Sequence, residues 1–201
     1  MLAMKASAPP RLPVPVPVRR GLSLIELTIV LAVVAVLVCL ALPGMADLVR
    51  RYQINTAAAD LHGALNLARA QAIARARRVT LAPLEPAGLD WGGGWVVFID
   101  TNADRRPGPG EEVLASHGPV PDGMVLHSSF TSNAAPYYMA FNSAGRGCSN
   151  TSSQAARWGT VSLSLGREVR RLRINMLGRV RVCDPARPQE GCPAQDQGPE
   201  G

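Results

Sequence analysis

The chain has few of the residues from which enzyme active sites are built. It holds only three histidines, and His62, His117 and His127 share no metal-like spacing. No Ser-His-Asp or Cys-His set can be assembled from the sequence, and no glycine-rich loop has phosphate-binding spacing. The sequence therefore predicts no enzymatic activity and no cofactor.

Cysteine is scarce as well, and the chain has no Cys-x-x-Cys pattern to suggest a zinc site. Cys39 lies in an apolar run and is expected to behave as a small hydrophobic residue. If the polar part of the chain is exported to an oxidising compartment, two of its three cysteines could form a disulfide. Cys183 and Cys192 are close in sequence and are the first choice, with Cys148 and Cys183 as the alternative.

Charge is absent from Leu27 to Ala46, a run of 20 residues. At about 1.5 Å per helical residue, such a run spans the roughly 30 Å hydrocarbon core of a bilayer. We therefore expect a transmembrane helix over residues 22–46.

The segment before this run is basic and rich in proline. It has five prolines between Pro9 and Pro17 and ends in Arg19-Arg20-Gly21. Positive charge before an apolar helix places residues 1–21 in the cytoplasm and the rest of the chain across the membrane. A secretory signal would be cut after the apolar run, and no small-residue cleavage motif follows it, which also disfavours twin-arginine export. Either Met1 or Met4 could be the true start.

Helical periodicity continues beyond Pro43-Gly44, where a kink or local melting is expected. Within residues 47–78, one apolar stripe recurs at spacings of three and four, so this stretch should pack on a sheet. The stripe contains Ile54, Ala57, Ala58, Leu61, Leu65, Ala68 and Ala72.

Residues 79–184 read as short strands separated by glycine and proline. The expected strands are Val79–Leu81, Trp95–Ile99, Val125–Leu126, Tyr137–Phe141, Val161–Leu165, Val169–Met176 and Val180–Val182. The tail at 185–201 is rich in proline, glycine, glutamine and acids, and is expected to be disordered. One long helix followed by strands is an α+β plan with an antiparallel sheet.

The segment Gly21-Leu22-Ser23-Leu24-Ile25-Glu26-Leu27 resembles the cleavage motif of type IV prepilins, although Leu22 stands where that family usually has phenylalanine. The resemblance implies that prepilin peptidase cuts between Gly21 and Leu22 and methylates the new amino terminus at Leu22. It also implies that Glu26 pairs with the terminal amine of a neighbouring subunit during assembly, and that Pro43 is the helix break. The alternative for Glu26 is an acid favoured by the helix start.

The polar part resembles the GspH/FimT branch of these proteins. The matching segments are Trp91 to Asp104 with Gly110-Glu111, Phe141 to Gly145, and Gly178 to Cys183. The resemblance implies a pilin-like fold and a minor pilin or pseudopilin of a type IV pilus or a type II secretion system. Such a subunit is a single-pass protein of the bacterial inner membrane with a periplasmic head, and its partners are other pilin subunits. A membrane-anchored domain outside any filament is the rival hypothesis.

Asp100-x-Asn102-x-Asp104 looks like the start of a calcium loop. However, the glycine expected next is replaced by Arg105-Arg106, whose charges oppose a cation. A hydrogen-bonded turn is the favoured interpretation, and no metal site is predicted.

Positive charge is concentrated near the carboxyl end, where residues 157–187 hold eight arginines and two acids. Alternation puts Leu172 and Ile174, with Met176, on one strand face and Arg171 and Arg173 on the other. If the next strand forms a hairpin with them, Arg179 and Arg181 share the arginine side, and forked guanidinium groups suit phosphate.

In the FimT proteins, a Gly-Arg-x-Arg element is associated with DNA binding during uptake, and Gly178-Arg179-Val180-Arg181 matches it. The resemblance thus implies electrostatic binding of double-stranded DNA, without base stacking because no aromatic residues are interleaved. The alternatives are a solvated face that protects an edge strand, and a purely structural secretion pseudopilin.

Overall fold

The computed structural model describes residues 21, 23–132 and 134–187, with residues 40–44 described as backbone only. The chain divides between Pro43 and Gly44 into two compact units, which are treated separately below. Most of the predicted leader, Leu22 at the predicted cleavage point, Cys192 and most of the expected disordered tail lie outside the described residues.

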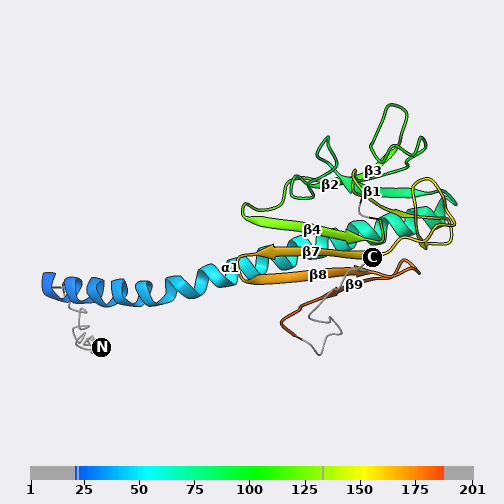
Figure 1. The fold of residues 1–201 in the computed structure, drawn as a ribbon. Coiled ribbons are helices and arrows are strands. Elements are labelled where there is room, and N and C mark those ends of the chain that lie inside the picture. The colour runs from blue at the N-terminus through cyan, green and yellow to red at the C-terminus, as the bar shows by residue number, and fades with distance from the viewer. Residues whose placement is uncertain (1–20, 22, 133, 188–201) are drawn as a thin grey trace, which may run out of the picture. The chain divides into compact units, whose positions relative to one another are not determined.

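One α-helix, α1, runs from Leu24 to Ala74 (Figure 1). Its start is capped by Ser23, whose Oγ accepts a hydrogen bond of 3.2 Å from the backbone N–H of Glu26. The helical backbone continues through Pro43, so no melted turn occurs there, while the expected kink stays a prediction. Across the described residues, no helix offers an apolar segment of the length and hydropathy that a membrane span requires.

In the second unit, the helix buries the stripe that the sequence predicts. All seven stripe residues, from Ile54 to Ala72, are at most 3% exposed. The helix ends at Ala74, because Ala76 adopts a left-handed conformation (φ 51°). Because Ala72 is fully buried, one-sided burial extends to the last turn of α1.

Two antiparallel sheets form the rest of this unit (Figure 1). Sheet A has the order β3-β2-β1-β5-β6, and sheet B has the order β4-β7-β8-β9. The strands of sheet A are β1 (Val79–Pro83), β2 (Trp95–Phe98), β3 (Val113–His117), β5 (Met139–Phe141) and β6 (Gly147–Cys148). Those of sheet B are β4 (Met124–Phe130), β7 (Gly159–Leu165), β8 (Glu168–Ile174) and β9 (Val180–Cys183).

Each strand expected from the sequence is present, and β3 and β6 are additional. Met176 corrects the prediction for β8, because it lies in the turn after that strand and is 55% exposed. The strand ends at Ile174, where the chain must reverse to pair with β9. The apolar side of β8 is therefore shorter than alternation alone suggests.

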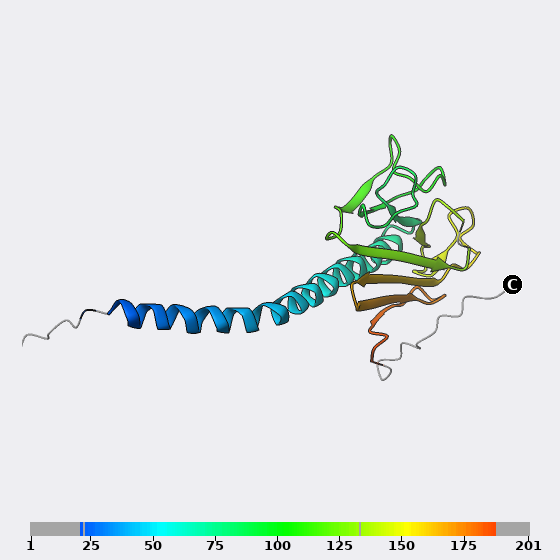
Figure 2. The same cartoon turned by 60° about the vertical axis from the view of Figure 1, so that its left-hand side comes forward.

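The main core fills the space between the second part of α1 and the inner faces of both sheets (Figure 2). It includes Leu61 and Leu65 from the helix, Phe141 from sheet A, and Leu163 and Leu172 from sheet B. A smaller cluster covers the other face of sheet A around Phe98 and Tyr138. Sheet B has no such second cluster among the described residues, so its outer face is open to solvent.

The cysteines distinguish the two predicted pairings. Cys148 is a free, buried thiol, and burial raises its pKa to about 11. The alternative pair of Cys148 with Cys183 is therefore wrong. Cys183 is disulfide-bonded, and because Cys192 lies outside the described residues, the pair of Cys183 with Cys192 stays a prediction.

Candidate functional site

The β8–β9 hairpin forms as the sequence predicts and carries a cluster of arginines. Leu172 pairs with Val182, and Arg173 pairs directly with Arg181. Leu172 is fully buried against the core, so alternation turns Arg173 and Arg181 to the outer face of sheet B. The term "arginine face" is used below for Arg171, Arg173, Arg179 and Arg181.

Three of the four arginines of the arginine face have no acidic partner among the described residues. Among the described residues, no carboxylate forms an ion pair with Arg173, Arg179 or Arg181, and all three are exposed. The fourth arginine, Arg171, is partly buried and is not among the exposed arginines without an acidic partner. Like charges directly opposite on neighbouring strands destabilise a sheet, so the pairing of Arg173 with Arg181 is unfavourable unless an anion lies over it.

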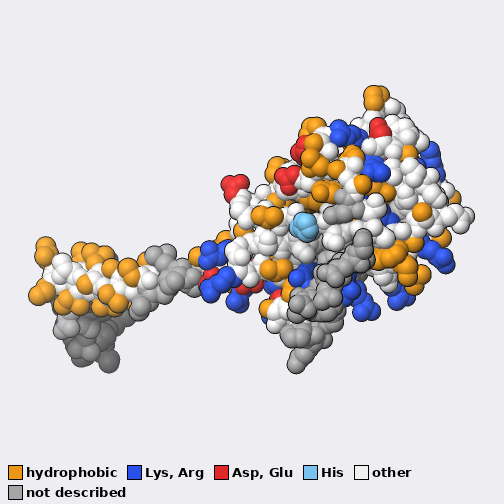
Figure 3. Space-filling model, in the orientation of Figure 1, with side chains coloured by type: hydrophobic (Ala, Val, Ile, Leu, Met, Phe, Trp, Pro, Cys, Tyr) orange, Lys and Arg blue, Asp and Glu red, His pale blue; other side chains and the backbone are white. Residues whose placement is uncertain are grey.

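The acids of this region lie on the other side of the sheet. Arg170, whose position alternates with the arginine face, forms ion pairs with Asp184 at 3.1 Å and Glu168 at 3.7 Å. Its Nε also donates to Asn55 Oδ1 of α1 at 2.8 Å. The acidic side chains of this region therefore face the helix, where they pair with Arg170. Basic side chains gather along the β8–β9 side of the molecule (Figure 3).

The turn between β8 and β9 depends on a glycine. Gly178 has φ 73°, and a Cβ there would lie 2.1 Å from the carbonyl oxygen of Gly145. That carbonyl also accepts a hydrogen bond of 2.9 Å from Arg69 Nε of α1. The segments Phe141–Gly145 and Gly178–Arg181, far apart in sequence, thus meet beside the helix end, a contact that the sequence does not reveal.

Asn142, in the predicted Phe141–Gly145 motif, stabilises the turn against which Gly178 packs. Asn142 Oδ1 accepts hydrogen bonds of 3.0 Å from the backbone N–H groups of Ala144 and Arg146. Its Nδ2 donates to the carbonyl of Ser153 at 2.9 Å. Asn142 therefore holds the loop that positions the arginine hairpin and has a structural role.

The tryptophan-glycine segment is also structural. Trp91 is buried and donates from Nε1 to Ser128 Oγ of β4 at 3.1 Å. Trp95 stacks on His117 with ring centroids 4.2 Å apart, and His117 Nε2 lies 3.4 Å from Asp60 of α1. These contacts tie sheet A and the loop before β2 to sheet B and to the helix.

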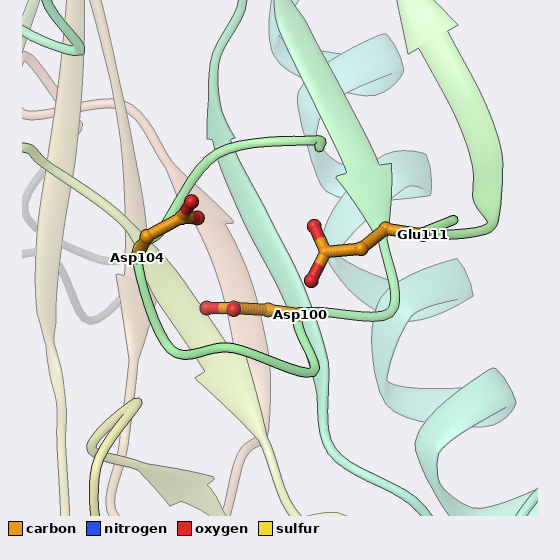
Figure 4. Close-up of side chains that lie close together, drawn as sticks. All are labelled: Asp100, Asp104 and Glu111. Carbon is orange, nitrogen blue, oxygen red and sulfur yellow. The ribbon is translucent and has the colours of Figure 1, made fainter. Parts of the chain in front are cut away.

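The loop between β2 and β3 carries the acidic residues noted in the sequence. Asp104 N donates to Asn102 Oδ1 at 3.0 Å, which confirms the predicted hydrogen-bonded turn. The sequence did not place Glu111, whose carboxylate reaches back into the turn. Oxygens of Asp100, Asp104 and Glu111 lie within 4.8 Å of one another, around a common space (Figure 4).

The three carboxylates differ in their surroundings. Burial alone would raise the pKa of Glu111, but hydrogen bonds from Thr101 N at 2.7 Å and Gly108 N at 3.0 Å lower that pKa overall. Asp100 is only 2% exposed, and burial together with the charge of Glu111 raises its pKa, despite backbone donors from Ala103 and Arg105. Asp104 is exposed.

At the amino-terminal end, the described residues of the predicted cleavage motif are accessible. Gly21 is exposed and nothing lies within 4 Å of a Cβ built on it. Glu26 is in the first turn of α1, where the helix dipole also favours an acid.

A family model for the "Type II transport protein GspH" matches residues 57–178 of the chain, which is more than half of it. The chain belongs to the GspH family. The match begins within the buried stripe of α1 and ends at Gly178, so this GspH protein has the family's characteristic head.

A curated relative of this GspH protein is the pilin-like protein PilA1 of Thermus thermophilus. The two are 40% identical over 99 residues, which is 49% of this chain and 60% of the relative's length.

Among solved structures, the type IV minor pilin FimU of Pseudomonas aeruginosa has the same fold. It matches with a TM-score of 0.52 and 19% identity, over 68% of this chain and 92% of FimU. The minor pseudopilin EpsH of Vibrio cholerae is a more distant match, with a TM-score of 0.46 and 12% identity over 67% of this chain and 99% of EpsH.

Proposed function

We propose that this GspH protein is a minor pilin or pseudopilin, a structural subunit of a type IV pilus or of the filament of a type II secretion system. Membership of the GspH family is the observation that carries the proposal. The pilin-like relative in Thermus and the fold shared with the minor pilin FimU support it. The protein acts by assembly and is not an enzyme.

The proposal includes maturation and membrane insertion. Prepilin peptidase removes residues 1–21 and methylates Leu22, and the uncharged run Leu27–Ala46 then anchors the chain in the inner membrane with its head in the periplasm. Apolar side chains of α1 such as Val30, Val33 and Leu37 are exposed, which suits contact with lipid or with neighbouring helices. A break at Pro43 would let this part of the helix adapt inside the filament.

Replacing Glu26 by alanine should abolish assembly and leave maturation intact. In a filament, the carboxylate pairs with the amine of a neighbouring subunit in an apolar setting, and removing one partner of such a pair costs about 3–5 kcal/mol. We expect the filament-bound fraction of the protein, measured in sheared filament preparations, to fall at least about tenfold.

Asp122→Ala is the matched control, because Asp122 is an exposed acid of the head whose side chain has no hydrogen bond or ion pair among the described residues. Normal assembly of the Glu26→Ala chain would favour the rival hypothesis, a membrane-anchored periplasmic domain outside any filament.

A second function is proposed for the arginine face, namely weak binding of double-stranded DNA during natural transformation. The directly opposed Arg173 and Arg181, without acidic partners among the described residues, favour a polyanion as the ligand. Gly178 sets the turn that places Arg179 next to this pair. The competing hypothesis is a secretion pseudopilin whose arginines are only solvated.

The Arg179→Ala/Arg181→Ala double variant tests this second function. Binding of the detergent-solubilised chain to a DNA duplex, followed by fluorescence anisotropy across a salt series, should weaken at least about tenfold at low salt. The slope of log affinity against log salt should become about two units shallower, because two phosphate contacts are lost.

Arg106→Ala/Arg167→Ala removes the same charge from two exposed arginines outside the arginine face. If this control weakens binding equally, the effect is one of net charge and the arginine face has no special role. If the wild-type chain does not bind DNA at low salt, the structural pseudopilin becomes the better description.

A further inference from the structure

The acidic loop between β2 and β3 has no role in the function proposed above. We propose that Asp100, Asp104 and Glu111 form a calcium-binding site in this loop. Each offers one carboxylate oxygen, and these oxygens lie within 4.8 Å of one another. That separation is about twice a calcium–oxygen distance, so one ion can contact all three.

The surroundings of the Asp100 carboxylate indicate that it binds a ligand. Asp100 is buried, with only 2% of the residue exposed. Oδ2 accepts a hydrogen bond of 3.3 Å from Arg105 N, whereas Oδ1 is buried and has no hydrogen-bond partner. A buried carboxylate oxygen without a partner is unfavourable, and the Asp100 side chain points into the space that Asp104 and Glu111 also face (Figure 4).

The neighbouring Arg105 and Arg78 form no ion pair with the Asp100 carboxylate. Arg105 turns away, donating from Nη1 to the carbonyls of Ala134, Ala135 and Pro136, and its guanidinium lies 4.7 Å from the centroid of the Tyr138 ring. Arg78 donates to the backbone carbonyl of Asp100 at 3.3 Å, and although its charge lowers the pKa of the Asp100 carboxyl, burial outweighs this effect. Within the described part of the chain, no ion pair involves the three carboxylates.

The chemistry of the ligands selects the ion. Three carboxylates and no nitrogen or sulfur ligand suit a hard cation, and calcium tolerates irregular geometry better than magnesium. Three protein ligands leave several positions for water, so the dissociation constant should resemble that of extracellular modules, about 10⁻⁴–10⁻³ M. Such a site fills where calcium is millimolar, outside the cytoplasm.

Calcium binding to the full chain in detergent micelles is the test, measured by isothermal titration calorimetry with calcium chloride after treatment with a chelator. We expect one saturable site per chain in that affinity range and at least about tenfold weaker binding of magnesium. Calcium should also slow tryptic cleavage between Arg105 and Arg106, since the ion joins the two ends of this loop.

Asp100→Asn and Asp104→Asn should each weaken calcium binding at least about tenfold, since even an outer partner of a metal site is worth 10–100-fold. Asp104 is exposed, so its variant keeps the test valid if the Asp100 variant does not fold. Asp122→Asn, an exposed acid elsewhere, should bind as the wild type does. The proposal is overturned if the wild type binds no calcium up to about 10 mM, if magnesium binds equally well, or if Asp104→Asn leaves the affinity unchanged.

Discussion

We expect a chain carrying Gly21→Val to keep its first 21 residues in cells that contain prepilin peptidase, and the wild-type chain to lose them. Gly21 is exposed and a Cβ there would meet no atom within 4 Å, so the structure gives no steric reason for the substitution to alter folding. We attribute the expected effect to close approach of the peptidase to the backbone, which glycine permits. Intact-mass spectrometry of the membrane fraction distinguishes the two forms, and we expect nearly complete retention of the leader.

Gly63→Ala is the control for the Gly21 substitution. Gly63 lies on the exposed side of α1, and a Cβ there also meets nothing within 4 Å. Its chain should be processed as the wild type is. Normal processing of the Gly21→Val chain would show that Gly21–Leu27 is not a prepilin motif, whatever the fold of the head.

Gly178→Ala should lower the free energy of unfolding by about 3 kcal/mol. A left-handed conformation costs a residue with a side chain about 1 kcal/mol or more, and the methyl group would lie 2.1 Å from the Gly145 carbonyl, which must move. For a chain of this size, that loss corresponds to a fall in melting temperature of roughly 6–12 °C, measured by circular dichroism.

Gly166→Ala separates the two causes of this loss. Gly166 also has a positive φ, 61°, but its Cβ would meet only Arg50 Cδ at 3.7 Å. It should therefore lose only the conformational part, about 1 kcal/mol. Equal losses in the two variants would mean that the contact between Gly178 and Gly145 contributes nothing.

The predictions that succeeded rest on local periodicity. The helical stripe from Ile54 to Ala72 follows from the 3.6-residue repeat, because one side of α1 is buried along its whole second part. The β8–β9 hairpin, with Arg173 opposite Arg181, follows from strict alternation in strands whose faces differ. In both elements, one side faces the core and the other faces solvent, so the order of apolar and polar residues along the chain predicts the structure.

The features that the sequence does not reveal depend on pairing between distant segments. In β3, Val113 is exposed and Leu114 is only partly buried, so no alternation marks the strand. Glu111 reaches Thr101 because β2 and β3 pair, and Gly178 meets Gly145 because two turns pack beside Arg69. Alternation alone places Met176 in the strand, because periodicity does not show where the chain reverses.

The two sides of sheet B differ in burial: its inner side belongs to the core of the head, and its outer side faces solvent. Along β4, Leu126 and Phe130 are buried while Val125, His127 and Ser129 face solvent, and the outer sides of β7 and β8 continue this surface with Ser162 and Arg173. Substitutions on that side leave the packing against α1 intact. The outer residues of the four strands can therefore be exchanged to present a different surface, while the interior that makes the fold stays as it is.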